Sequence, residues 1–370
     1  MRSKVSLVAV AINLSCFGVA AVAADPPAAS AAPAAPTLTQ VLASSGITAT
    51  GYVDGTYSYL SASPSGSPSF DTNTFALNQA SLTVAYTPAS GFGALVNAVM
   101  GTEACNGCYA PGYGSLGAPA GTGSINLLQG YLQYVGGKAT FMGGKFVTLA
   151  GAEVAAPTGN TNVTRSLLFW YSEPVTHVGA RVAYAASDKA TFTVGVNNGW
   201  NNDSSSAKGG KTAELGMTLT PSKVFTLGAA GYYGDFDQTS GIVGKRALVD
   251  LVATWTATPA LTVILNADWD QQENAGADGH GTASWYGAAG YLNYAINDTW
   301  RTSLRLEYLD DKDGYSFGTK TEVDEGTLTF GYAPAKNFEL RIEGRYDTLK
   351  PTGGSSSNAT QGWLQALFKF

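Results

Sequence analysis

Residues 338–349, FELRIEGRYDTL, carry a charged side chain at every second position. Successive side chains of a β-strand point to opposite sides of the sheet, so this alternation predicts a strand with two different faces. The charged face carries Glu339, Arg341, Glu343, Arg345 and Asp347. The other face carries Leu340, Ile342 and Tyr346. A hydrophobic protein core does not accept such a row of charges. We therefore expect the charged face to contact water and the other face to contact an apolar medium.

Residues 261–270 and 300–309 repeat this pattern. Their polar faces carry Asn266, Asp268, Asp270, Arg301, Arg305 and Glu307. Their apolar faces carry Leu261, Val263, Leu265, Trp269, Leu304, Leu306 and Tyr308. The last ten residues, QGWLQALFKF, also alternate, with Phe368 and Phe370 on the apolar face. Such strands are typical of a transmembrane β-barrel, which has lipid outside and water inside. A final aromatic residue is also the kind of signal that the barrel assembly machinery accepts.

The N-terminal residues have the features of a secretory signal peptide. Arg2 and Lys4 precede an apolar stretch, Val5–Val22, and the small-x-small pattern at 21–23 predicts a signal peptide over residues 1–24. A retained membrane anchor is the alternative, which Asn13 and Ser15 inside the stretch disfavour. No later apolar run reaches about 18 residues, so we expect no membrane-spanning helix. An exported chain can instead span the outer membrane of a bacterium as a closed sheet.

The remaining chain is acidic and divides into a leader and a long repetitive body. Removal of residues 1–24 leaves 19 basic and 27 acidic residues, which argues against a nucleic-acid partner. Residues 25–45 form a Pro/Ala-rich periplasmic leader, in which the spacing of Leu38, Val41 and Leu42 predicts a short helix near 38–44. This helix either lies at the periplasmic rim or partly plugs the lumen.

Residues 46–370 alternate between short and long connections. Seven short turns are expected near Pro88, Gly137, Asp188, Pro221, Pro259, Asp298 and Pro334. Eight longer polar or glycine-rich connections separate them. Short periplasmic turns and long external loops are typical of outer-membrane barrels. The count predicts an all-β, antiparallel up-and-down barrel of sixteen strands, with both termini in the periplasm. Fourteen and eighteen strands are the alternatives.

The longest connection, Leu149–Pro174, contains both charged and large apolar residues. Long connections in compact folds are usually functional or disordered. One hypothesis folds this segment into the barrel mouth, with Glu153, Arg165 and Glu173 at a constriction and Lys145 opposite or beneath. The alternative is that residues 167–171 begin the next strand and face lipid.

The predicted lumen contains charges of both signs. Arg301, Arg305, Arg341 and Arg345 lie on strands separated by one neighbour, and we expect a basic wall facing Asp268, Asp270 and Glu325. Such opposed walls would orient polar solutes in a transverse field. The alternative is that the charges only neutralise one another and support the wall.

Other side chains suggest structural roles. Cys105 and Cys108, in CNGC, predict a loop disulfide in an oxidising compartment. A metal site is disfavoured there because His177 and His280 are distant in sequence. No cofactor is expected. Aromatic girdles at the membrane interfaces are expected from Tyr52, Tyr86, Tyr184, Trp255, Tyr294 and Tyr332.

Three blocks carry a resemblance to a known family. They are GKFVTLAGAEV at 144–154, TRSLLFWYSEPVTHVGAR at 164–181 and GVNNGWNND at 195–203, followed by Lys211 and Thr212. In their order and spacing they resemble the OmpL-like β-barrel porin-2 family of outer-membrane proteins. The resemblance extends over residues 46–370. It implies an outer-membrane barrel with passive solute transport, and it supplies no substrate.

The predicted size favours a channel. Barrels of about sixteen strands leave an aqueous lumen. We therefore expect a porin for small hydrophilic solutes or ions, with selectivity set by pore width and charge. Its other expected partners are outer-membrane lipid and the barrel assembly machinery, and the sequence leaves open a homotrimer.

Two other classes of protein are alternatives to this prediction. A plugged, structural or adhesive surface barrel is the alternative to a porin. An outer-membrane hydrolase is disfavoured because Ser166 and His177 lack a Gly-x-Ser-x-Gly context.

Overall fold

The computed structural model describes residues 44–60, 73–103, 124–201, 210–237, 243–275 and 281–370. The chain divides into two units, Met1–Val41 and Leu42–Phe370, and the first lies outside these ranges. The predicted signal peptide, both cysteines of the predicted disulfide and His280 also lie outside them. Of the helix predicted near 38–44, only Ser44 is described, and it is helical together with Ser45. Within the described ranges, no helix is long and apolar enough to cross a membrane.

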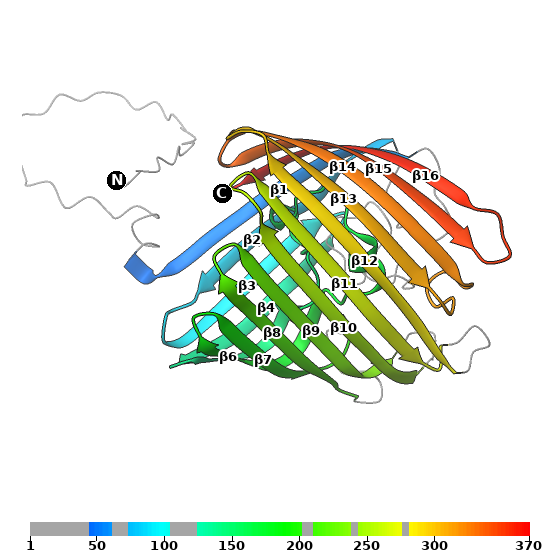
Figure 1. Cartoon of the computed structure of the whole chain (residues 1–370). Coiled ribbons are helices and arrows are strands. Elements are labelled where there is room, and N and C mark those ends of the chain that lie inside the picture. The colour runs from blue at the N-terminus through cyan, green and yellow to red at the C-terminus, as the bar shows by residue number, and fades with distance from the viewer. Residues whose placement is uncertain (1–43, 61–72, 104–123, 202–209, 238–242, 276–280) are drawn as a thin grey trace, which may run out of the picture. The chain divides into compact units, whose positions relative to one another are not determined.

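The described part of the second unit is a closed barrel of sixteen antiparallel strands (Figure 1). Each strand pairs with its neighbours in sequence, and β1 pairs with β16 to close the sheet. The predicted strand number is confirmed. The strands are β1 (Ile47–Leu60), β2 (Thr74–Tyr86), β3 (Gly91–Gly101), β4 (Ser124–Gly136), β5 (Ala139–Val147), β6 (Thr176–Ser187), β7 (Ala190–Asn197), β8 (Thr212–Ser222), β9 (Phe225–Asp237), β10 (Val243–Thr256), β11 (Leu261–Glu273), β12 (Thr282–Ala295), β13 (Trp300–Asp311), β14 (Thr321–Ala335), β15 (Phe338–Pro351) and β16 (Ser357–Lys369).

The connections between strands alternate in length around the barrel. All seven predicted short turns join an even-numbered strand to the next odd-numbered strand, and they contain two to four residues. The connections from odd-numbered to even-numbered strands contain five to 28 residues. Because adjacent strands run in opposite directions, all the short turns lie at one end of the barrel and all the longer connections at the other.

The two faces of the strands follow the predicted alternation. On β13, the side chain of Arg305 is fully buried inside, whereas its neighbour Leu306 is 57% exposed on the outer surface. The same arrangement holds for the charged face of β15 and for the acidic residues of β11. An apolar outward face agrees with the expectation that this surface contacts lipid, which offers no hydrogen bonds to polar side chains.

One predicted interfacial aromatic residue points inward. Tyr52 is buried, and its hydroxyl donates a hydrogen bond to Gln79 Oε1 at 2.6 Å. Its prediction as a girdle residue is wrong because alternation along β1 places it on the same face as Asp54 and Thr56, which are also buried. Of the other five, four are exposed on the outer surface and Tyr332 is half-buried. Those four are Tyr86, Tyr184, Trp255 and Tyr294.

Residues 148–175, between β5 and β6, form an inserted loop that is packed inside the barrel. This inserted loop contains a 3₁₀ helix, η1 (Pro157–Gly159), and a short α-helix, α2 (Leu167–Tyr171). Ser166 is the N-cap of α2, because its hydroxyl accepts a hydrogen bond from Phe169 N at 3.0 Å. All five side chains of α2 are buried. The loop is therefore part of the barrel interior.

The hypothesis that residues 167–171 begin a lipid-facing strand is wrong, because β6 begins only at Thr176. The side chains of α2 instead pack in a hydrophobic cluster with inward residues of six strands, including Trp285, Leu309, Val323 and Leu349. Burying these surfaces against each other removes apolar area from water on both sides. The inserted loop is consequently held by an apolar part of the barrel wall as well as by polar contacts.

Candidate pore constriction

The inserted loop is bound to well-separated parts of the barrel wall. On β2, Gln79 Nε2 donates to the carbonyl of Ala155 at 3.1 Å. On β9, the hydroxyl of Tyr232 accepts a hydrogen bond from Leu149 N at 2.9 Å. On β12, Trp285 Nε1 donates to the carbonyl of Tyr171 at 3.0 Å. Contacts with strands so far apart around the barrel mean that the loop crosses the lumen.

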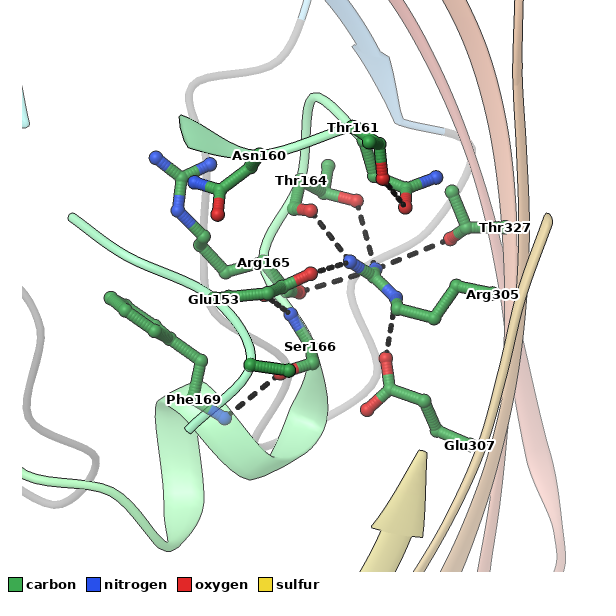
Figure 2. A network of polar contacts seen from close by, with 12 residues as sticks. Glu153, Asn160, Thr161, Thr164, Arg165, Ser166, Phe169, Arg305, Glu307 and Thr327 are labelled. Atoms are coloured by element: carbon green, nitrogen blue, oxygen red, sulfur yellow. Dashed lines mark hydrogen bonds and ion pairs between the residues drawn. The ribbon is translucent and has the colours of Figure 1, made fainter. Parts of the chain in front are cut away.

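Arg305 is the centre of the largest polar network between the wall and the loop (Figure 2). Its Nη1 donates to Glu153 Oε1 at 2.8 Å and to the carbonyl of Thr164 at 2.7 Å. Its Nε lies 2.6 Å from Glu307 Oε1 and 3.2 Å from Glu325 Oε2. A fully buried guanidinium needs such a set of anionic and carbonyl acceptors, because burial of an unpaired charge is costly. Arg305 therefore fixes the loop to β13.

Carboxylates of the wall accept hydrogen bonds from the loop backbone before and at α2. On β15, Glu343 accepts from Val163 N at 2.6 Å, Thr164 N at 2.9 Å and Thr164 Oγ1 at 2.7 Å. On β13, Glu307 Oε2 accepts from Leu167 N at 2.5 Å. The first N–H groups of a helix have no partner within the helix, and an anion at this end is stabilising. These carboxylates provide the acceptors that irregular buried backbone requires.

Arg165 and Glu153 hold the loop in its folded shape. Arg165 Nε donates to the carbonyl of Val154 at 2.9 Å, and its Nη2 donates to that of Ala155 at 2.8 Å. Glu153 Oε2 accepts from Ser166 N at 2.6 Å. Both side chains are buried. Two of the three residues expected at the constriction thus cross-link the two halves of the loop.

All four arginines of the predicted basic wall donate to carbonyl groups of the loop. Besides Arg305, Arg301 Nη1 donates to Thr161 O at 2.7 Å, Arg341 Nη1 to Pro157 O at 3.3 Å and Arg345 Nη1 to Arg165 O at 2.7 Å. Each also has a carboxylate partner in Glu325, Glu339 or Asp347. The basic wall is present, but the loop covers it.

The expectation that acidic residues face this wall across the lumen needs correction. Glu325 lies on β14, between the strands of Arg305 and Arg345, and it pairs with both. Asp268 and Asp270 lie on β11, only two strands from β13. The acidic group is therefore next to the basic wall around the circumference. The alternation along a strand shows which of its side chains point inward. It does not show where around the barrel that strand lies.

Glu173, at the end of the loop, lies apart from the arginine network. One of its carboxylate oxygens lies within 4.8 Å of oxygens of Asp250 and Asp268, which are on β10 and β11. Asn266 Nδ2 donates to Asp250 Oδ2 at 2.7 Å, and Asn266 Oδ1 accepts from Ala152 N at 2.8 Å. Three buried carboxyl groups this close repel one another when ionised.

Several interior residues were missed by the sequence reasoning. Gln79, Tyr232 and Trp285 bind the loop, as described above. Arg246 lies among four aromatic rings, with its guanidinium carbon 3.6 Å from the ring centroid of Phe236 and 5.0 Å from that of Trp200. The period-two pattern of β10, in which Asp250 is inward, could have placed Arg246 inside.

Lys145 and His177 lie inside the barrel at the two ends of the loop. Lys145 is buried on β5, the strand that precedes the loop. His177 is fully buried on β6, its Nδ1 lies 3.1 Å from Gly199 O, and its ring stacks on Tyr232 at 4.8 Å. These contacts, and the capping role of Ser166, are structural.

Comparison with known proteins identifies the family. The family described as "Putative beta-barrel porin-2, OmpL-like" matches residues 46–370. Among curated proteins, no significant match is found.

Solved structures share the fold at low sequence identity. The outer membrane channel DcaP of Acinetobacter baumannii has a TM-score of 0.63 at 14% identity, over 88% of this chain and 97% of that chain. The trimer form of in-vitro folded OmpT, an outer membrane protein of Vibrio cholerae, has a TM-score of 0.62 at 13% identity, over 88% and 99%. An anion-selective porin from Comamonas acidovorans has a TM-score of 0.57 at 9% identity, over 88% and 99%. The chain therefore belongs to the OmpL-like β-barrel porin-2 family and is a porin-like barrel of the bacterial outer membrane.

Proposed function

We propose that the protein is a porin through which small hydrophilic solutes or ions diffuse passively, and that the inserted loop narrows its lumen. The observation that carries this proposal is the loop itself, which crosses a sixteen-stranded barrel and is fixed to charged residues of the wall. Barrels of this size leave room for an aqueous channel, and a fixed inward loop reduces its width. Diffusion down a gradient then needs no further machinery.

The predicted pore-lining residues divide into two groups by exposure. The side chains of Arg305 and Arg345 are at most 1% exposed, so we assign them to support of the loop. The side chain of Arg301 is 24% exposed and that of its partner Glu339 is 13% exposed. Charged groups that reach the aqueous path act most strongly on a passing ion, because they lie nearest to it. We therefore propose that Arg301 and Glu339 contribute more to ion selectivity than the buried residues Arg305 and Arg345.

Single-channel conductance of the detergent-purified protein in a planar bilayer tests both points. We expect stable open-channel steps, and a salt gradient would report ion preference through the reversal potential. Arg301→Ala should move the reversal potential towards the equilibrium potential of the cation, because a positive charge is lost from the aqueous path. Lys350→Ala is the control, because Lys350 is half exposed at an outward position of β15, and it should leave the reversal potential unchanged. Protein shown to be folded but without conductance would overturn the porin proposal and favour a plugged, structural or adhesive barrel.

We also propose a homotrimer, because one of the similar structures is a trimer form. In the same recordings, a trimer would close in three equal steps. We expect no hydrolase activity, since Ser166 and His177 have the structural partners described above. The signal peptide at 1–24, the leader at 25–45 and the disulfide between Cys105 and Cys108 stay predictions from the sequence.

A further inference from the structure

We propose that Glu173, Asp250 and Asp268 bind a hard divalent cation, Ca²⁺ or Mg²⁺, which fastens the end of the inserted loop to β10 and β11. The three residues come from separate segments: Glu173 from the loop, Asp250 from β10 and Asp268 from β11. A cation held by all three would fasten the loop to β10 and β11. Among the described residues, no arginine of these two strands contacts the loop.

The spacing of the carboxylates fits a cation. One oxygen from each residue can be chosen so that all three lie within 4.8 Å of one another. Ca²⁺ binds oxygens at about 2.3–2.6 Å, so two oxygens on opposite sides of the ion are about 5 Å apart. The three oxygens are therefore close enough to share one ion.

Two of the carboxylate oxygens in this cluster lack a hydrogen-bond partner among the described residues. Glu173 is 3% exposed and its Oε1 has no hydrogen-bond partner in the described part of the chain. Asp268 is 4% exposed, and the same is true of its Oδ2. Burial of ionised carboxylates without a cation or donor is strongly unfavourable.

The charge balance differs from that beside Arg305. There, Glu153, Glu307 and Glu325 share a buried guanidinium. Among the described residues, no ion pair links Glu173, Asp250 or Asp268 to Lys or Arg. A bound divalent cation would supply positive charge where the end of the inserted loop meets β10 and β11.

Neighbouring groups are arranged around this cluster. Asn266 Nδ2 donates to Asp250 Oδ2 at 2.7 Å and lies 3.2 Å from Asp268 Oδ1, so one amide positions both carboxylates. Gly151 has φ +91°, and a Cβ at this position would lie 2.0 Å from Glu173 Oε2. Glycine here leaves space for the Glu173 carboxylate next to the loop backbone.

The ligand chemistry selects the class of metal. The cluster consists of carboxylates alone, without His or Cys. Oxygen ligands suit Mg²⁺ and Ca²⁺, whereas imidazole and thiolate favour zinc and copper. The competing explanation is that the carboxyl groups are protonated and share hydrogen bonds, in which case added cations would have no specific effect.

Calcium binding to the full barrel tests the proposal. The protein is purified in detergent, freed of lipopolysaccharide and stripped with EDTA, and Ca²⁺ is then titrated by calorimetry. The temperature at which the folded barrel loses its fast electrophoretic mobility is measured with and without Ca²⁺. We expect one Ca²⁺ per chain and a higher transition temperature, because a ligand that binds only the folded state stabilises it.

Two variants and one control assign the ion to the cluster. Glu173→Gln and Asp268→Asn should each lower Ca²⁺ affinity at least tenfold and remove most of the stabilisation. Glu214→Gln is the control, since Glu214 is a buried luminal carboxylate that pairs with Arg181. It should retain the affinity of the unmodified chain. Absence of stoichiometric binding, or equal binding by all variants, would overturn the proposal. These measurements need no open channel, so their outcome is independent of the proposed porin activity.

Discussion

At the scale of single residues, Arg305 provides the sharpest test of how the loop is held. Arg305→Met would leave Glu153, Glu307 and Glu325 buried without their shared cation. Removal of one partner from a buried ionic network typically costs about 3–5 kcal/mol. We expect a loss of this size in the free energy of unfolding, measured by urea titration of tryptophan fluorescence in lipid vesicles.

The matched control for Arg305 is a charge in an exposed ion pair. Lys350 pairs with Asp324, and both side chains are nearly half exposed. Exposed pairs of this kind contribute little because water solvates both charges. Lys350→Met should therefore leave the unfolding curve unchanged. Equal effects of the two substitutions would show that Arg305 is not a structural centre.

The sequence predicted which side of the strand these residues face, but not which groups their side chains bind. The alternation of Arg301, Arg305 and Glu307 with apolar neighbours correctly placed these charges inside. It did not show that the guanidinium of Arg305 is used up by loop carbonyls, because those partners are about 140 residues away in sequence. Tyr52 differs for another reason: aromatic residues are common at membrane interfaces, but the period of β1 places this one inside the barrel.

At the scale of elements, the inserted loop is supported by an exception to the polar lining of the barrel. Leu309 follows Arg305 and Glu307 on the inner face of β13, and Leu349 follows Asp347 on that of β15. These apolar inward positions were visible in the sequence and indicate an internal apolar partner. The apolar run at 167–171 left two paths open, into the barrel or towards lipid, and the sequence alone did not decide between them.

Shortening the inserted loop should widen the pore. The strand pairing of the barrel is complete without residues 152–173, so a short Gly/Ser linker in their place should leave a folded barrel. We expect single-channel conductance to rise severalfold, because the segment that crosses the lumen is lost. Replacement of residues 353–355, in the connection between β15 and β16, is the control and should leave conductance unchanged. Unchanged conductance after the loop replacement would mean that the loop does not limit the pore.

At the scale of the whole molecule, strand number and closure followed from simple sequence signals. Short and long connections alternate along the chain. Seven short turns and eight longer connections join sixteen strands. Bulges did not follow from the pattern, such as the register shift between Asp54 and Gly55 in the pairing of β1 with β2. Such irregularities depend on packing across strands, which a single strand's period does not contain.

Closure of the barrel brings the last strand against the first. A substitution at this junction can distinguish a role of Phe370 in assembly from a role in stability. The backbone N–H and C=O groups of Phe370 both bond to Gly51 at 2.9 Å, whereas the Phe370 side chain is 61% exposed on the outer surface. Phe370→Ala keeps the backbone bonds that close the sheet. We therefore expect nearly normal folding into detergent in vitro, but several-fold less protein in the outer membrane of cells, because the side chain is proposed to be recognised by the barrel assembly machinery. Leu364→Ala, at another outward position of β16, is the control and should be inserted normally. Heat-modifiable electrophoresis of membrane fractions measures both, and equal insertion of the two variants would rule out an assembly role for Phe370.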